Sequence, residues 1–252
     1  MIINNIKISI ITVCYNSAAT IEDTIKSVQC QTHKNIEYIV VDGGSKDTTL
    51  DIVNKYKEIV SKSVSESDKG LYDAMNKGVN IATGEVIGFV HSDDILADNQ
   101  IVSTLANLFE KENLDGVYGD LQYVDKNNIG KIIRYWKSTN FNSSLLKKGW
   151  MPAHPTLFLK RGVYKKHGDF DLSFKIAADY DFMLRVLKDQ SLKFSYLPEV
   201  ITKMRVGGAS NRSLKNIFKK TKEDYRAICL NNVGGFITLI LKNTSKVKQF
   251  FI

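Results

Sequence analysis

The chain has 252 residues, of which 43% are hydrophobic and 25% are charged. This length allows one large domain or one domain with an extension, and the composition excludes disordered, collagen-like and disulfide-rich classes. The net charge of +8 is uneven, since residues 1–120 carry 10 basic and 18 acidic side chains and residues 121–252 carry 25 and 9. This split indicates an anionic partner such as a phosphate ligand, nucleic acid or a membrane surface, although solvated lysines give the same count.

The three cysteines are Cys14, Cys30 and Cys229, and their wide spacing argues against a zinc site or a disulfide framework. A reducing cytosol fits this pattern. The sequence shows neither a signal peptide nor a run of about 20 apolar residues that could span a bilayer. We therefore expect a cytoplasmic protein.

The first half alternates strand and helix patterns. Strands are predicted over residues 7–13, 37–41 and 86–90, and helices over 21–28, 50–56, 73–82 and 101–109. The strands are β-branched and almost wholly apolar, as in strands buried on both faces. This order predicts an α/β fold with a mostly parallel sheet, right-handed crossovers and flanking helices.

The second half is less regular. Residues 116–125 and 132–136 suggest a hairpin, 156–160 and 194–197 further strands, and 179–188 a helix. After Arg212 the pattern is that of a basic helical region. We expect one main domain over residues 1–211 and a helical extension over 212–252.

Polar side chains follow three of the predicted strands. Thr12, Tyr15 and Asn16 end the first, residues 42–45 (DGGS) end the second, and residues 91–94 (HSDD) follow the strand VIGFV. Ligands of open α/β sheets bind beyond the carboxyl ends of the strands, so these loops should converge in one crevice. Each alone could be a helix cap or a plain turn.

Asp93 and Asp94 are adjacent carboxylates that repel each other unless a cation or donors compensate them. Oxygen ligands suit Mg²⁺ or Mn²⁺, which often bridge carboxylates to a diphosphate. A solvated turn in which one Asp caps the next helix is the alternative.

Asp68, Lys69 and Gly70 form a loop before a helix, where backbone N–H groups and a cation could meet an anion. The alternative is helix entry with Asp68 or Asp73 as the cap.

Asp179 and Asp181 lie at the start of another helix pattern and could be caps or a general base. Residues two apart on a helix point about 200° apart, so only one can face a given site. Asp179 precedes the predicted helix and is the better candidate.

Trp150 and His154 belong to the Pro-braced loop WMPAHPT, which could contact a sugar. Core packing of Trp150 and ordinary hydrogen bonding of His154 are the alternatives.

Together these segments resemble the nucleotide-sugar-dependent glycosyltransferases of family 2, which have the Rossmann-like GT-A fold. The matching stretches are ISIITVCYNSAATIEDTIKSVQCQT, IEYIVVDGGSKDTT, SESDKGLYDAMNKGVNIATGEVIGFVHSDD and AADYDFMLRV, within about residues 6–210. The segments KGWMPAHPTLFLKR and MRVGGASN are similar to a subgroup that builds bacterial surface polysaccharides.

The resemblance implies a role for each matching position. The nucleotide would contact Thr12, Tyr15, Asn16, Asp42 (through the base), Asp68 and Asp93 (through the ribose). Asp94, with Asp93, would hold the divalent metal, Mn²⁺ or Mg²⁺, and Asp179 would be the catalytic base. Apart from the resemblance, we expect Lys69 to contact the nucleotide, and Arg205 or the backbone of Gly207 and Gly208 to bind the diphosphate. Trp150, His154 and Asp181 are the candidate acceptor contacts.

Three departures from the family pattern are visible. Ala178 stands where many members have Glu, His91 stands where Asp or Asn is common, and residues 197–211 contain none of the histidines that some members use as a metal ligand.

The predicted activity is that of an inverting glycosyltransferase in surface polysaccharide biosynthesis, acting on a glycan or lipid-linked acceptor. A sugar nucleotidyltransferase is one alternative, but residues 14–20 (CYNSAAT) lack the glycines and basic residues of its phosphate loop. A non-catalytic basic membrane-surface module is the other. We see no nucleic-acid-binding motif.

The extension over 212–252 carries 9 basic and 2 acidic residues beside large apolar ones. This composition suggests peripheral contact with an anionic inner leaflet, where a lipid-linked acceptor would lie.

Overall fold

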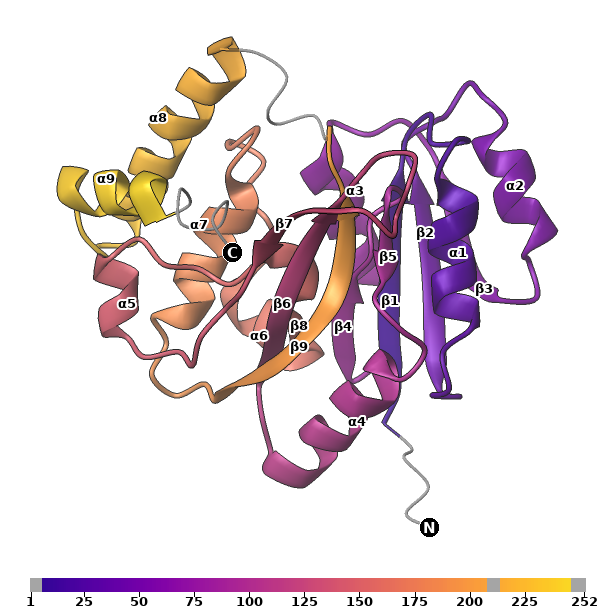
Figure 1. The fold of residues 1–252 in the computed structure, drawn as a ribbon, viewed down its shortest axis with the longest axis horizontal. Helices are drawn as coiled ribbons and strands as arrows, with labels where there is room; N and C mark the ends of the chain where they lie inside the picture. Colours follow the sequence, from indigo (N-terminus) through magenta and orange to yellow (C-terminus); the bar gives the residue numbers. More distant parts are fainter. Residues whose placement is uncertain (1–5, 208–213, 246–252) are drawn as a thin grey trace.

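The computed structural model describes residues 6–207 and 214–245 and consists of a mixed β-sheet flanked by helices (Figure 1). Within these residues the sheet has nine strands in the order β3-β2-β1-β4-β8-β6-β9-β5, and β7 pairs with β6. The strands are β1 (Ile8–Cys14), β2 (Ile36–Asp42), β3 (Val60–Ser65), β4 (Val86–Phe89), β5 (Asp94–Leu96), β6 (Gly116–Val124), β7 (Ile132–Trp136), β8 (Phe158–Lys160) and β9 (Phe194–Arg205).

The helices cover both faces of this sheet. They are α1 (Ile21–Gln29), α2 (Thr49–Lys55), α3 (Leu71–Ile81), α4 (Ile101–Glu112), α5 (Ser144–Lys147), α6 (Arg161–His167), α7 (Ala178–Leu187), α8 (Leu214–Leu230) and α9 (Phe236–Ser245), with a 3₁₀ turn, η1, at His154–Thr156. None of the helices in the described ranges is long and apolar enough to cross a membrane.

The first half of the sheet is parallel, as predicted. β1 pairs in parallel with β2 on one side and β4 on the other, and β3 adds to β2. Every residue of β1 is buried, which explains its apolar, β-branched sequence. The edge strand β3 is not among the predicted strands, because a lysine interrupts its half-buried side and serines form its exposed side.

The second half is mixed. The β6–β7 hairpin is confirmed, and β8 runs antiparallel to both β4 and β6. β9 is parallel to β6 and continues to Arg205, well beyond the predicted end at residue 197. Pro198 hides this continuation in the sequence, since a proline lacks the N–H that a sheet ladder uses; the register between β6 and β9 shifts beside it.

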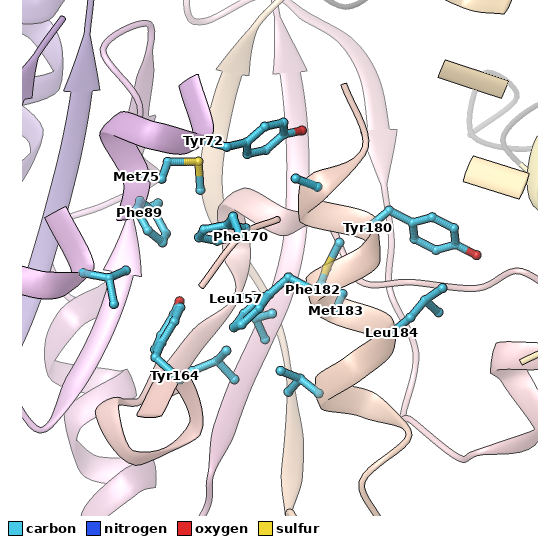
Figure 2. Close-up of a cluster of buried hydrophobic side chains, with 14 of the residues drawn as sticks. Tyr72, Met75, Phe89, Leu157, Tyr164, Phe170, Tyr180, Phe182, Met183 and Leu184 are labelled. Carbon is cyan, nitrogen blue, oxygen red and sulfur yellow. The ribbon is translucent and has the colours of Figure 1, made fainter. Parts of the chain in front are cut away.

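Alternate residues of β1 belong to two hydrophobic layers. Ile8 and Ile10 pack with α1 and α4, whereas Ile11 and Val13 pack with α3 and the helices of the second half. The second layer contains an aromatic cluster on α7 and its neighbours, in which Tyr72 reaches from α3 towards the start of α7 (Figure 2).

The predicted helical C-terminal region is confirmed, and it shares the main core. Ala227, Ile228, Val233 and Leu239 are buried in the same layer as α7. The predicted domain boundary at residue 211 lies outside the described residues, and α8 and α9 on its far side complete the core of the sheet domain.

A buried ion pair ties the two C-terminal helices to α7. Lys242 Nζ lies 2.6 Å from Asp224 Oδ1, and both side chains are almost completely buried. The same ammonium lies 3.5 Å from the centroid of the Tyr180 ring. Burial lowers the pKa of Lys242 to about 8, although Asp224 opposes this shift.

If α8 is part of the core, a buried and an exposed position of this helix should respond differently to truncation. Ile228→Ala should lower the free energy of unfolding by about 2–5 kcal/mol, because it leaves a cavity, whereas Phe218→Ala, at an exposed site, should change it by less than about 0.5 kcal/mol. Urea unfolding of both variants measures this difference. Equal, small effects would mean that α8 does not contribute to the core.

Candidate active site

The loops that follow β1, β2 and β4 meet at one edge of the sheet, as the sequence predicted. The Asn16 N–H donates to Ser45 Oγ at 2.8 Å, and Asn16 Oδ1 accepts from the Lys46 N–H at 2.8 Å. The hydroxyls of Ser17 and Ser92 are 2.8 Å apart. Asn16 has a φ of 49°, in the left-handed region that asparagine tolerates better than most residues. These contacts join three loops into one rim.

Tyr15 and Asp68 form an accessible corner on this rim. The Tyr15 side chain is 61% exposed. A side-chain carbon added to Gly43 would lie 2.2 Å from Asp68 Oδ2 and 3.5 Å from Tyr15 Cδ2, so the Asp68 carboxylate occupies the space that glycine leaves. Lys69 follows on the same loop and is exposed. An aromatic face beside a carboxylate can stack on a base and accept its N–H groups.

Thr12 and Asp42, which are predicted to contact the nucleotide, are both completely buried. The Thr12 hydroxyl donates to the Val90 carbonyl oxygen at 2.6 Å, inside the sheet. Asp42 Oδ2 accepts hydrogen bonds from two backbone N–H groups of its own loop and from the Ser65 hydroxyl, while Oδ1 accepts from Ser45 Oγ. Burial acts to raise the pKa of Asp42, but these hydrogen bonds lower it below its usual value. Both residues therefore shape the rim from beneath.

Asp94 is a buried carboxylate that lacks a hydrogen-bond partner for either oxygen among the described residues. Burial raises its pKa well above the usual value, Asp93 raises it further, and Arg205 opposes the shift. Asp93 beside it is half-buried. This pair carries negative charge that the described side chains compensate poorly.

Arg205 joins two loops of the site. Its guanidinium donates to Asp23 Oδ2 at 2.6 Å and to the Asp93 carbonyl oxygen at 3.1 Å, and the side chain is buried. Arg205 therefore lies against the 91–94 turn, and its role at the diphosphate stays a prediction.

The donor set at residues 93–94 fits a divalent cation that is completed by substrate. The described residues contain no group of three His, Cys, Asp or Glu side chains that would hold a metal alone. Mg²⁺ and Mn²⁺ are often held by one or two carboxylates together with phosphate oxygens and water. The unpartnered oxygens of Asp94 are the feature that such an ion would satisfy.

Asp179 lies in the first turn of α7, which begins one residue before it, and not ahead of the helix as predicted. The carboxylate is half-buried, and the Tyr72 hydroxyl lies 3.0 Å from Asp179 Oδ1 and 2.7 Å from the Ile176 carbonyl oxygen. Burial raises the pKa of Tyr72, and Asp179 raises it further. Tyr72 stays a hydrogen-bond donor to the carboxylate.

Two neutral histidines connect Asp179 to the 91–94 turn. The rings of His91 and His154 stack with centroids 6.0 Å apart. Burial lowers the pKa of His91 to about 3, with His154 adding to the shift and Asp179 opposing it. Burial also lowers the pKa of His154, again against Asp179. The Asp179 carboxylate thus lies within electrostatic reach of both rings, one of which belongs to the 91–94 turn.

Asp181 and Trp150 have other partners in this structure, and their contacts with an acceptor stay predictions. Asp181 Oδ2 accepts from Arg185 Nε at 2.9 Å, and Oδ1 accepts from Asn231 Nδ2 at 2.8 Å. The Trp150 ring packs against those of Tyr118 and Phe141, each at 5.7 Å between centroids.

Comparison with known proteins agrees with this geometry. The family described as "Glycosyl transferase family 2" matches residues 9–168. A "PGL/p-HBAD biosynthesis glycosyltransferase" of Mycobacterium tuberculosis is 32% identical over 217 residues, covering 84% of this chain and 82% of the relative. An uncharacterized glycosyltransferase of Rickettsia typhi is 31% identical over 243 residues, covering 93% of this chain and 73% of that protein.

Solved structures share the fold at low sequence identity. S. aureus TarS, residues 1–349, in complex with UDP-GlcNAc, has a TM-score of 0.70 at 20% identity, covering 90% of this chain and 66% of that one. This chain thus spans slightly less than two thirds of that TarS chain. A mannosyltransferase from Pyrobaculum calidifontis, in complex with GDP-Man and Mn²⁺, has a TM-score of 0.65 at 15% identity, covering 97% of this chain and 75% of the other.

If Asp94 is a metal ligand, its replacement should stabilise the metal-free protein. The raised pKa means that ionising Asp94 costs stability as the pH rises through that pKa. In EDTA at neutral pH, Asp94→Asn should therefore raise the free energy of unfolding by about 0.5–2 kcal/mol. The same variant should lose the increase in melting temperature that Mn²⁺, added together with a nucleoside diphosphate, gives the unmodified protein.

Thermal unfolding with EDTA and with Mn²⁺ measures both effects. Asp51→Asn, at an exposed carboxylate of α2, is the control and should leave the response to Mn²⁺ unchanged. An Asp94→Asn protein that Mn²⁺ still stabilises fully would exclude Asp94 as a ligand.

Proposed function

This chain belongs to glycosyl transferase family 2 and is a glycosyltransferase, and we propose that it moves a sugar from a nucleotide-sugar donor to an acceptor hydroxyl with inversion at the anomeric carbon. The family and the α/β GT-A fold are as the sequence predicted. The observation that supports the reaction is the half-buried Asp179 carboxylate, which Tyr72 holds beside the 91–94 turn.

In the proposed reaction Asp179 accepts the proton of the acceptor hydroxyl. The acceptor oxygen forms a bond to the anomeric carbon while the bond from that carbon to the diphosphate oxygen breaks on the opposite face. The nucleoside diphosphate leaves with the electron pair. A hydroxyl is a poor nucleophile without such a base. A divalent ion held by Asp93 and Asp94 would supply positive charge against the departing diphosphate.

The Tyr15–Asp68 corner is the proposed base subsite, with Asn16 and Lys69 on either side of it. Its exposed ring and carboxylate offer stacking and an acceptor to the nucleobase. Solved neighbours hold UDP-GlcNAc or GDP-Man, so UDP-, GDP- and dTDP-sugars form the first panel. A thermal-shift screen of this panel with Mn²⁺ or Mg²⁺ identifies the donor by the largest stabilisation.

Replacement of the base should separate binding from chemistry. Asp179→Asn should lower the turnover number by about 10²–10⁴-fold, because general base catalysis is lost. Nucleoside diphosphate affinity should stay within about twofold, since Asp179 lies on the acceptor side. Release of UDP or GDP from the identified donor, together with isothermal titration calorimetry, measures the two quantities.

Asp181→Asn is the discriminating comparison, since it makes the same change two residues later in the same helix. Its carboxylate binds Arg185 and Asn231, so this change should lower stability and leave turnover within about threefold. If Asp181→Asn abolishes transfer and Asp179→Asn does not, the assignment of the base is wrong.

The proposed acceptor is a glycan or a lipid-linked sugar, and the proposed setting is cytoplasmic, at the inner face of the membrane. Phe236, Ile237, Ile240 and Leu241 lie on one side of α9 and are exposed, the first two by 64% and 73%. Exposed Lys219, Lys222 and Arg226 lie on the neighbouring α8. Apolar side chains beside basic ones are the combination that binds an anionic lipid surface. His154 remains the proposed acceptor contact nearest Asp179.

Vesicle binding tests this surface. The test compares co-sedimentation with vesicles of phosphatidylcholine that contain about 30% phosphatidylglycerol. Replacing Phe236 and Ile237 with Ser should weaken this binding by at least about tenfold, because burying each large apolar side chain in the lipid contributes about 1.5–3 kcal/mol. Ile132→Ser, an exposed apolar site on the β6–β7 hairpin, is the control. If both variants bind the anionic vesicles equally well, the proposed surface is wrong. The same holds if the unmodified protein binds vesicles of phosphatidylcholine alone as well as it binds the anionic ones.

A further inference from the structure

Glu223, on α8, binds a turn of backbone that leads directly into the helix of Asp179. Its Oε2 atom accepts hydrogen bonds from the N–H groups of Lys175, Ile176 and Ala177 at 2.9, 2.8 and 3.1 Å. The Glu223 side chain is buried. Three consecutive N–H groups that converge on one carboxylate oxygen are a strong, charge-assisted contact.

These three residues determine where α7 starts. Ala177 is the N-cap of α7, and Asp179 follows two residues later in the first turn. The first N–H groups of a helix, and those just before it, have no partner within the helix. The turn ahead of α7 therefore takes its partner from α8, at a residue 46 positions after Ala177 in the sequence.

The Ile176 residue is held from both sides. Its N–H donates to Glu223, and its carbonyl oxygen accepts from the Tyr72 hydroxyl at 2.7 Å. The same hydroxyl lies 3.0 Å from Asp179 Oδ1. Asp179 and the backbone before it thus share one partner, Tyr72 of α3. The backbone has a second partner, Glu223 of α8.

Neighbouring contacts of α8 act on the same turn. One guanidinium nitrogen of Arg226 donates to Ser173 Oγ at 2.9 Å, and the guanidinium carbon lies 4.4 Å from the centroid of the Phe174 ring. On the other side of Glu223, Asp224 pairs with Lys242 against the Tyr180 ring. Glu223 lies between these contacts and binds the backbone N–H groups of the turn.

We propose that Glu223 is a positioning residue for the glycosyl transfer reaction, which fixes the carboxylate of Asp179 by holding the turn 175–177. This inference rests on the proposed role of Asp179 as the base. A displacement of about 1 Å at a catalytic group can lower a rate by about 10²-fold. The C-terminal helices are then part of the catalytic apparatus as well as of the core.

Glu223→Ala and Glu223→Gln test the proposal in the full chain. Glu223→Ala should lower the turnover number by about 10–100-fold and leave the affinity for UDP or GDP within about twofold, because only the base moves. Glu223→Gln keeps an acceptor oxygen and should recover at least about a third of the activity. Hydrogen exchange of the 175–177 amides should accelerate in Glu223→Ala, by at least about tenfold.

Asn231→Ala is the matched control. Asn231 directly follows the last residue of α8, is also buried, and also donates to α7, at Asp181 Oδ1. It should lower the melting temperature without changing turnover by more than about threefold or exchange at 175–177. Assays are run well below the melting temperature of each variant.

The outcomes separate the two proposals. Turnover of Glu223→Ala within twofold of the unmodified protein, unchanged exchange at 175–177, or an equal loss of turnover in Asn231→Ala would each overturn the role of Glu223. If Asp179→Asn transfers sugar normally, the proposed base is wrong. If Asp179→Asn is inactive while Glu223→Ala is not, only the positioning role fails. Should Glu223→Ala not fold, Glu223→Asp, whose carboxylate is one carbon shorter and cannot reach the turn, takes its place in both measurements, and unchanged exchange at 175–177 would overturn the role.

Discussion

Parallel pairing of β1 with β2 and β4 is the constraint on which the site depends. It brings the carboxyl ends of three strands to one edge of the sheet, where the loops after them are joined by short hydrogen bonds. The buried carboxylate of Asp42 organises the loop after β2, because each of its oxygens accepts from that loop. The donor half of the site is therefore built by neighbours in the sheet and needs little from the rest of the chain.

The acceptor half is built differently, by contacts between elements far apart in the sequence. Tyr72 on α3 meets Asp179 on α7, and Glu223 on α8 meets the turn before α7. These contacts cross the aromatic layer that α3 and α7 share (Figure 2). The C-terminal helices close this layer from outside (Figure 1), so the half of the chain with the larger positive charge also supports the base.

The sequence was sufficient to predict the parallel strands and the helices between them, because buried β-branched runs and helical spacing are local patterns. It also located the three loops and Asp179, which the topological rule and the family motifs bring to one edge. It could not show that Thr12 and Asp42 are buried, because the sequence pattern of a polar residue at a strand end is the same whether its side chain faces a ligand or a neighbouring loop.

Contacts between elements far apart in the chain could also not be predicted from the sequence. Nothing near Glu223 in the sequence distinguishes it from a solvated residue of a basic helix, since its three partners are backbone N–H groups about 46–48 positions away. Arg205 was placed at the diphosphate because a basic residue near the site suggests one; its actual partner, Asp23, lies at the other end of the chain. Tyr72 was missed because one aromatic residue in a helix pattern usually signals packing alone.

Gly43 has a consequence for how such a site can change. Its missing side chain leaves the volume that the Asp68 carboxylate fills, and a carbon at position 43 would lie 2.2 Å from that oxygen. Positions 43 and 68 therefore compete for one space, so that an acidic group can enter the corner beside Tyr15 from either loop but not from both. A chain that acquired a side chain at 43 would turn the Asp68 carboxylate, the free end of a side chain, away from Tyr15, and would so change the corner without disturbing the backbone.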